Sequence, residues 1–201
     1  MPARERDTAR TRRVVLDAAA RAVVAHGAGV SLDLIARTAG VSKGGLLHHF
    51  RNREQLLLEL ARDLAEQFTA AVHAAVDPRD HARGRLVRGY VRAALDGSGD
   101  GSTASEHVIL AASLAGVPGV AELLEEDNRT WNEALDADGL DPDRVRLITL
   151  AADGAAVASL YGGGTDPDET RRLRELLIRL SRDEGPLVDA TEPGSSGTGA
   201  S

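Results

Sequence analysis

The chain of 201 residues contains no cysteine. This absence excludes disulfide scaffolds, thiol nucleophiles and cysteine-ligated zinc or iron–sulfur centres, and it suits a reducing compartment. Long hydrophobic runs are missing too. The longest stretch without a charged residue, 107–121, is interrupted by Gly116 and Pro118 and is too short to cross a bilayer. The first residues lack the apolar core of a signal peptide. We therefore expect a cytoplasmic protein without a membrane segment.

Aromatic residues make up only 2% of the chain, although 42% of its residues are hydrophobic. This balance favours close-packed helices over a strand-rich fold. Apolar residues recur with helical spacing, and no strand-like alternation persists. The sequence therefore predicts an all-α fold of about nine helices, delimited by capping residues, glycines and three Asp-Pro pairs. The expected helices are 8–26, 31–40, 42–49, 52–76, 78–96, one beginning at Thr103, 118–137, 142–161 and 167–182.

These helices divide into a small N-terminal domain, 1–51, and a larger helical domain, 52–184. The last stretch, 185–201, consists mainly of Gly, Ser, Thr and Pro, and we predict that it is disordered. Charge is divided unevenly along the chain. Residues 1–53 hold ten basic and four acidic side chains, whereas the remainder carries a net charge of −13. A basic head on an acidic protein favours contact with a polyanion, and a basic face that only keeps the protein soluble is the alternative.

Residues 31–50 meet the steric demands of a helix-turn-helix. Two short helices that cross steeply need a small residue at their contact and a residue that can turn between them. Ala36 and Gly40 supply these. Apolar anchors for the inner faces are Ile35, Ala39, Val41 and Leu46. The second helix is then expected to lie in the major groove of DNA, with its first residues at the base edges.

The second of these helices carries side chains that suit a phosphate backbone. Lys43 is a positive charge, Gly44 and Gly45 allow a close approach of the backbone, and His48 and His49 can donate hydrogen bonds to phosphate oxygens. An ordinary loop followed by a polar helix end is the structural alternative. Together with the basic head, the pattern favours nucleic-acid binding.

The stretch from Thr11 to Leu58, with Ala-Gly-Val-Ser-Lys-Gly-Gly-Leu-Leu-His-His-Phe at its centre and Asn-Arg-Glu-Gln-Leu-Leu after it, resembles the DNA-binding domain of the TetR family of one-component repressors. The resemblance implies an all-helical homodimer that binds a palindromic double-stranded operator and releases it when a small molecule enters the C-terminal domain. It also implies DNA contacts for a set of polar residues and glycines. These are Arg12, Ser31, Ser42, Lys43, Gly44, Gly45, His48, His49 and Arg53.

Two positions depart from the family pattern. Gly45 stands where the family commonly has a threonine, and Leu47 where it commonly has a tyrosine. Both changes delete a hydroxyl that can bind phosphate. We therefore expect affinity to depend more on the arginine-rich arm, 4–13.

The resemblance also implies an effector site among the helices that follow residue 76. We expect its lining among the large or polar residues on otherwise aliphatic helix faces, and the effector to be small and largely apolar. The candidates are Phe68, Tyr90, His107, Asn128, Trp131, Asp153 and Tyr161. Each could instead be an ordinary core residue with an internal partner.

Small residues crowd the predicted helix 142–161, and leucines form a stripe on 167–182. Together they predict a two-helix patch that becomes a four-helix dimer interface, although packing within one monomer is the alternative. The sequence contains no complete enzymatic motif. The glycine-rich loop 97–102 follows no strand, and the aspartates between 136 and 143 lack the glutamate that an EF-hand requires. We expect no catalytic residues, metal or cofactor, and the rival function is a helical adaptor that uses its head to bind protein.

Overall fold

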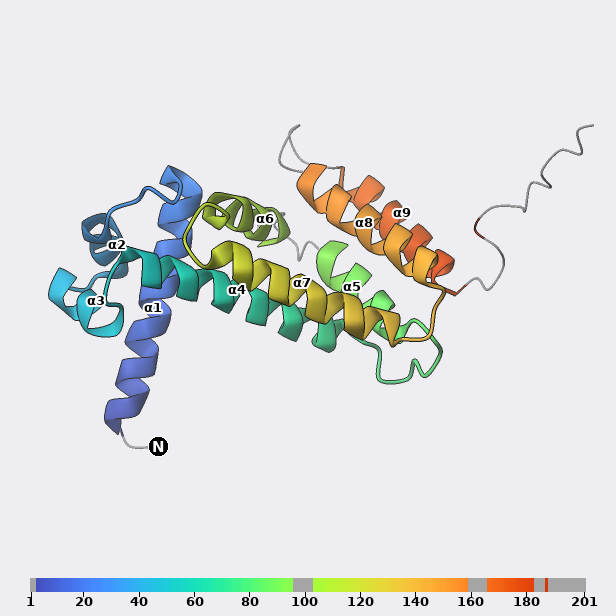
Figure 1. Cartoon of the computed structure of the whole chain (residues 1–201), viewed down its shortest axis with the longest axis horizontal. Helices are drawn as coiled ribbons and strands as arrows, with labels where there is room; N and C mark the ends of the chain where they lie inside the picture. The colour runs from blue at the N-terminus through green and yellow to red at the C-terminus, as the bar shows by residue number, and fades with distance from the viewer. Residues whose placement is uncertain (1–2, 96–102, 159–165, 183–186, 188–201) are drawn as a thin grey trace, which may run out of the picture.

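The computed structural model describes residues 3–95, 103–158, 166–182 and 187, which contain nine α-helices and no strand (Figure 1). The helices are α1 (Ala3–His26), α2 (Leu32–Ala39), α3 (Lys43–His49), α4 (Arg53–Ala75), α5 (Arg85–Leu95), α6 (Thr103–Leu114), α7 (Val120–Asp136), α8 (Pro142–Ala158) and α9 (Pro167–Leu180). The expected all-α fold is confirmed. None of the described helices is both long and apolar enough to cross a membrane.

Local capping explains where most of these helices begin. Ser31 Oγ accepts a hydrogen bond from Leu34 N at 3.2 Å, and Ser42 Oγ accepts one from Gly45 N at 3.0 Å. Each bond satisfies a backbone donor that the first turn of a helix leaves free. Asn52 does the same for α4, since its Oδ1 accepts from the backbone of Gln55 at 2.8 Å. These three starts agree with the sequence prediction.

The start of α5 was predicted wrongly. The sequence favours a helix from Pro78, but α5 begins at Arg85. Asp77 Oδ1 accepts from Arg79 N at 2.9 Å and forms a tight turn in place of a helical cap. The cap of α5 comes from 52 residues away, because the Asp138 carboxylate accepts from Leu86 N at 2.6 Å.

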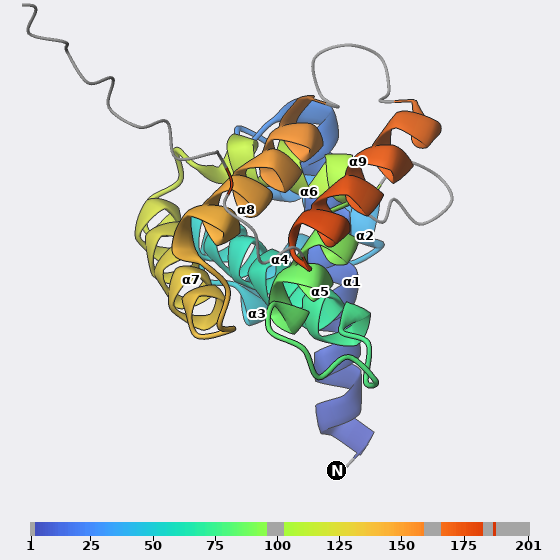
Figure 2. The same ribbon diagram turned by 90° about the vertical axis from the view of Figure 1, so that its right-hand side faces the viewer.

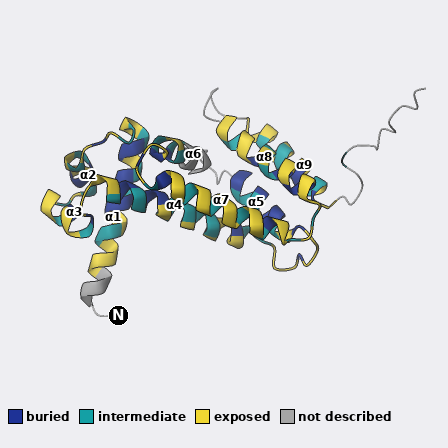
Figure 3. Cartoon of the chain, viewed as in Figure 1, coloured by how far each residue is buried: buried dark blue, intermediate teal, exposed yellow. Residues whose placement is uncertain are grey.

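Two hydrophobic cores organise the molecule (Figure 3). The first joins α1, α2, α3 and the first half of α4 to the end of α6 and the start of α7. Its fully buried residues include Ile35, Leu46 and Phe50. The second core lies among α5, α8, α9 and the last turns of α7, around Ile148 and Ala152. The first core therefore extends beyond the N-terminal domain predicted at residues 1–51.

Helices α4 and α7 run lengthwise beside each other, and α8 and α9 form a pair on the opposite side of α5 (Figures 1 and 2). Helix α5 contacts α4, α8 and α9, so it is the central element of the larger domain. The predicted N-terminal arm is helical, because α1 begins at Ala3.

Candidate functional site

Helices α2 and α3 form a helix-turn-helix with the predicted turn. Gly40 adopts φ +69°, a left-handed conformation that favours glycine, and Val41 N donates to Ala36 O at 3.0 Å. Leu46 and Phe50 are fully buried and anchor α3 to the first core. The opposite side of α3 is exposed and contains Ser42, Lys43, Gly44, Leu47 and His48. The turn and the anchors thus leave this exposed surface of α3 available to a partner.

The basic side chains of the head have different environments. Lys43 Nζ lies 2.8 Å from Asp33 Oδ2, and each side chain is 52% exposed, so water competes strongly with this ion pair. Arg12 Nη2 contacts Glu59 Oε2 at 2.6 Å, and its guanidinium lies 5.0 Å from the centre of the Phe50 ring. These contacts fix Arg12 between α1 and α4, where it stabilises the head itself.

The remaining predicted residues of the head lie close to α3. Ser31 and Ser42 are exposed, and each hydroxyl caps its helix. The rings of His48 and His49 meet edge to face with centroids 5.5 Å apart. Arg53, at the start of α4, donates from Nη1 to Ala28 O at 3.1 Å and ties α4 to the loop before α2.

Three of the predicted effector-site residues form one aromatic cluster in the larger domain. Phe68 of α4, Tyr90 of α5 and Trp131 of α7 are half-buried and meet edge to face. Their ring centroids are 5.3, 5.8 and 5.6 Å apart for the pairs Phe68–Tyr90, Phe68–Trp131 and Tyr90–Trp131. The structure therefore brings together side chains that are up to 63 positions apart in the sequence.

Carboxylates border this cluster. Tyr90 donates its hydroxyl to Asp153 Oδ1 at 2.7 Å, which adds a fourth predicted residue, from α8. Burial raises the pKa of Tyr90, and the adjacent Asp153 raises it further. Desolvation also raises the pKa of Asp153, against the lowering effect of the hydrogen bond from Tyr90. Asp127, one helical turn before Trp131, has its pKa raised by desolvation. The cluster is thus aromatic at its centre and acidic at its edge.

The other three predictions are not part of this cluster. Asn128 is exposed on α7, and its Oδ1 accepts a hydrogen bond from Asn132 Nδ2 at 3.4 Å. The Tyr161 prediction and the side chain of His107 lie outside the described residues. A cavity of about 340 Å³ lies near the cluster, at the ends of α4 and α7 and the start of α5. It is lined by His73, Val76, Arg85, Leu86, Ala134, Ala137 and Asp138, none of which was predicted.

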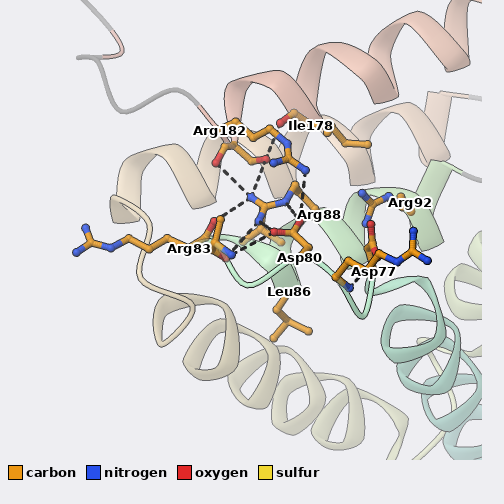
Figure 4. A network of polar contacts seen from close by, with 12 residues as sticks. Asp77, Asp80, Arg83, Leu86, Arg88, Arg92, Ile178 and Arg182 are labelled. Atoms are coloured by element: carbon orange, nitrogen blue, oxygen red, sulfur yellow. Dashed lines mark hydrogen bonds and ion pairs between the residues drawn. The ribbon is translucent and has the colours of Figure 1, made fainter.

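A buried polar network was also missed (Figure 4). Arg88 is fully buried and donates from Nε and Nη2 to the Asp80 carboxylate at 2.6 and 2.8 Å. Arg88 also donates to Arg83 O at 2.9 Å and reaches Ser181 at the end of α9. The sequence contains one sign of this network, because Arg88 lies on the same helix face as the apolar Val91, three residues later. The network joins the start of α5 to the end of α9 and pairs the buried Arg88 with a carboxylate.

Comparison with known proteins identifies the fold. Residues 15–60 match the model described as bacterial regulatory proteins, tetR family, and residues 84–182 match the tetracyclin repressor-like C-terminal domain. The chain belongs to the TetR family. Members of this family are transcriptional regulators and not enzymes.

Two curated relatives match part of the chain. The transcriptional regulator BetI of Agrobacterium fabrum is 42% identical over 74 residues, which are 34% of this chain and 36% of BetI. BetI of Rhizobium meliloti is 38% identical over 87 residues, or 41% of this chain and 42% of that protein. The match spans well under half the length of either relative.

Solved structures match most of the chain. The multidrug binding protein EbrR in complex with malachite green is 28% identical with a TM-score of 0.64, and the alignment covers 84% of this chain and 96% of EbrR. A TetR-family member from Streptomyces coelicolor is 27% identical with a TM-score of 0.62, over 85% of this chain and 97% of that one. NalD of Pseudomonas aeruginosa, at 21% identity and a TM-score of 0.60, shares the fold over 89% of this chain.

Proposed function

We propose that the chain is a cytoplasmic repressor that binds a palindromic DNA operator as a homodimer and releases it when a small molecule binds the larger domain. The observation that carries this proposal is the exposed surface of α3, which a buried Leu46 and Phe50 hold in place. A recognition helix needs this combination of a fixed inner face and a free outer face.

The DNA contacts follow from this surface. Lys43 can exchange its exposed ion pair with Asp33 for a phosphate, since such a pair is worth little in water. Gly44 has open space around it, apart from Ser42 Oγ at 4.0 Å, so the backbone of α3 can approach a groove closely. Arg12 and Arg53 already bind acceptors within the head, and we assign them a supporting role in addition to any phosphate contact.

The dimer proposal rests on the surface of α8 and α9. Leu147, Leu150 and Val157 of α8 are 49%, 62% and 42% exposed, and Leu176 of α9 is 51% exposed. Gly154 lies within the same stripe of α8, and nothing in the described chain lies within 4 Å of a Cβ added there. A glycine in mid-helix is unfavourable by about 1 kcal/mol relative to alanine. At this surface the missing side chain of Gly154 lets a helix of a second protomer approach closely.

Effector binding rests on the aromatic cluster of Phe68, Tyr90 and Trp131, which lies where α4, α5 and α7 meet. EbrR, a structure of similar fold, holds malachite green. A rearrangement of these three helices can reach α3, because α4 begins four residues after α3 ends. We propose that this arrangement couples the effector to DNA release.

Selection of DNA from a random library by the purified protein tests the proposal. We expect enrichment of a palindrome whose half-sites lie about one DNA turn apart, and sedimentation at twice 21.1 kDa. A monomer that binds one half-site as tightly as the full palindrome would contradict it. Failure to bind DNA even at low salt would favour the adaptor function, in which the head contacts a protein.

A further inference from the structure

The aromatic cluster of Phe68, Tyr90 and Trp131 has an unusual electrostatic setting. Aromatic rings present negative faces, and each of these three side chains is half-buried, so part of the cluster is open to a ligand. Two carboxylates lie at its edge, because Asp153 of α8 accepts the Tyr90 hydroxyl at 2.7 Å and half-buried Asp127 of α7 lies one helical turn before Trp131. The His73 ring also lies 6.5 Å from that of Trp131, and the remaining features around the cluster favour positive charge.

No basic side chain among the described residues forms an ion pair with these carboxylates. Asp153 accepts a hydrogen bond from the neutral hydroxyl of Tyr90, and neither aspartate forms an ion pair with a described basic side chain. The fully buried Arg88 at the start of α5, by contrast, has an anionic partner, since it lies 2.6 Å from Asp80. Asp127 is half-buried and Asp153 is exposed on α8, so both carboxylates are only partly desolvated, and this partial desolvation raises the pKa of each.

We infer that the aromatic cluster with Asp127 and Asp153 binds the positively charged group of a cationic effector, a quaternary or aromatic ammonium ion with an apolar body. The inference rests on the proposed function and narrows the class of effector. A cation over the ring faces gains cation–π attraction and compensates both carboxylates. A neutral apolar compound of the same shape would fill the same space and leave the two carboxylates without a counter-ion.

A pair of ligands that differ in one atom tests the charge requirement. Phenyltrimethylammonium and tert-butylbenzene have nearly the same shape, but only the first is a cation. Trp131 is the only tryptophan of the chain, so its fluorescence reports binding at the cluster, and calorimetry on the full-length protein checks the affinity independently. We expect saturable binding of the cation, and binding of tert-butylbenzene at least about ten-fold weaker.

Isosteric variants locate the effect. Asp127→Asn and Asp153→Asn should each weaken binding of the cation about three-fold to ten-fold and leave the affinity for tert-butylbenzene unchanged. The asparagine of the second variant still offers Tyr90 an acceptor oxygen. Glu125→Gln removes an exposed carboxylate two residues from Asp127 and serves as the matched control, with no expected change.

Three results would overturn the inference. These are equal affinity for the two ligands, wild-type cation binding in the double Asp127→Asn/Asp153→Asn variant, and no cation binding at millimolar concentration by either method. DNA binding is measured on the same samples. A protein that binds its operator but not the cation refutes this inference alone, whereas one that binds the cation but no DNA refutes the proposed function alone.

Discussion

Lys43 offers the sharpest test of the DNA-binding surface. Its ammonium group lies 2.8 Å from Asp33, and both side chains are half-exposed, so the pair can open at little cost. If each protomer places one Lys43 on a phosphate, Lys43→Ala removes two contacts from the dimer and flattens the slope of log K against log salt by about 1.8. Between 50 and 200 mM salt, the affinity deficit of the variant should therefore shrink about twelve-fold.

The matched variant is Asp33→Asn, which keeps the shape of the side chain and frees Lys43. Because an exposed ion pair is worth at most about 1 kcal/mol, DNA affinity should rise by up to about five-fold for each protomer. Fluorescence anisotropy of a labelled operator at four salt concentrations measures both effects. The reasoning is refuted if Lys43→Ala leaves the salt slope unchanged, or if Asp33→Asn weakens binding.

Further predictions concern the core, the dimer and the groove. Asp80→Asn leaves Arg88 buried without its anion and should destabilise the fold by about 3 to 5 kcal/mol in urea unfolding, and a loss below about 1 kcal/mol would contradict this. The Arg88 hydrogen bonds lower the pKa of Asp80, so the stabilisation is complete above about pH 4 and is lost as the pH falls through that lowered pKa; Asp80→Asn should abolish this part of the acid dependence. Leu147→Glu with Leu176→Glu should produce monomers in sedimentation and reduce operator binding, and unchanged dimers would refute the interface. Gly44→Val should weaken operator binding while thermal unfolding stays at the wild-type temperature.

The helix-turn-helix was predictable because its signals are local. Ser31, Ser42 and Asn52 each cap a backbone N–H three residues later, and Gly40 supplies the left-handed turn between α2 and α3. Interactions over so few residues depend little on the rest of the chain. Helix boundaries around the head therefore agree with the sequence prediction to within one residue, except that α1 begins at Ala3, five residues before the predicted start.

The larger domain depends on contacts that the sequence does not reveal. Asp77 was expected to start a helix, but the cap of α5 is Asp138, 52 residues from Leu86. Asn128 was placed in an apolar stripe with Trp131, yet a small rotation of α7 leaves it exposed and turns the neighbouring Asp127 partly inward. A helical pattern fixes the face of a helix only to within about one residue, or 100°, and neighbouring helices decide the rest.

The arrangement of the two cores explains how one site can act on the other. Helix α4 carries Leu57 into the first core and Phe68 to the second, and α7 carries Val120 into the first and Leu135 into the second. Both helices are therefore continuous rods between the head and the aromatic cluster. Close packing resists local compression, so a ligand that separates α4 from α7 at the cluster must tilt one rod against the head. Because α3 is anchored to the first core through Leu46, we expect such a tilt to move α3 and change the distance between the two recognition helices of a dimer. For a shift from mostly bound to mostly released, the effector must favour the tilted state by about 5.5 kcal/mol, which exceeds the roughly 2 kcal/mol of one cation–π contact and therefore requires the carboxylates and apolar contacts to contribute as well.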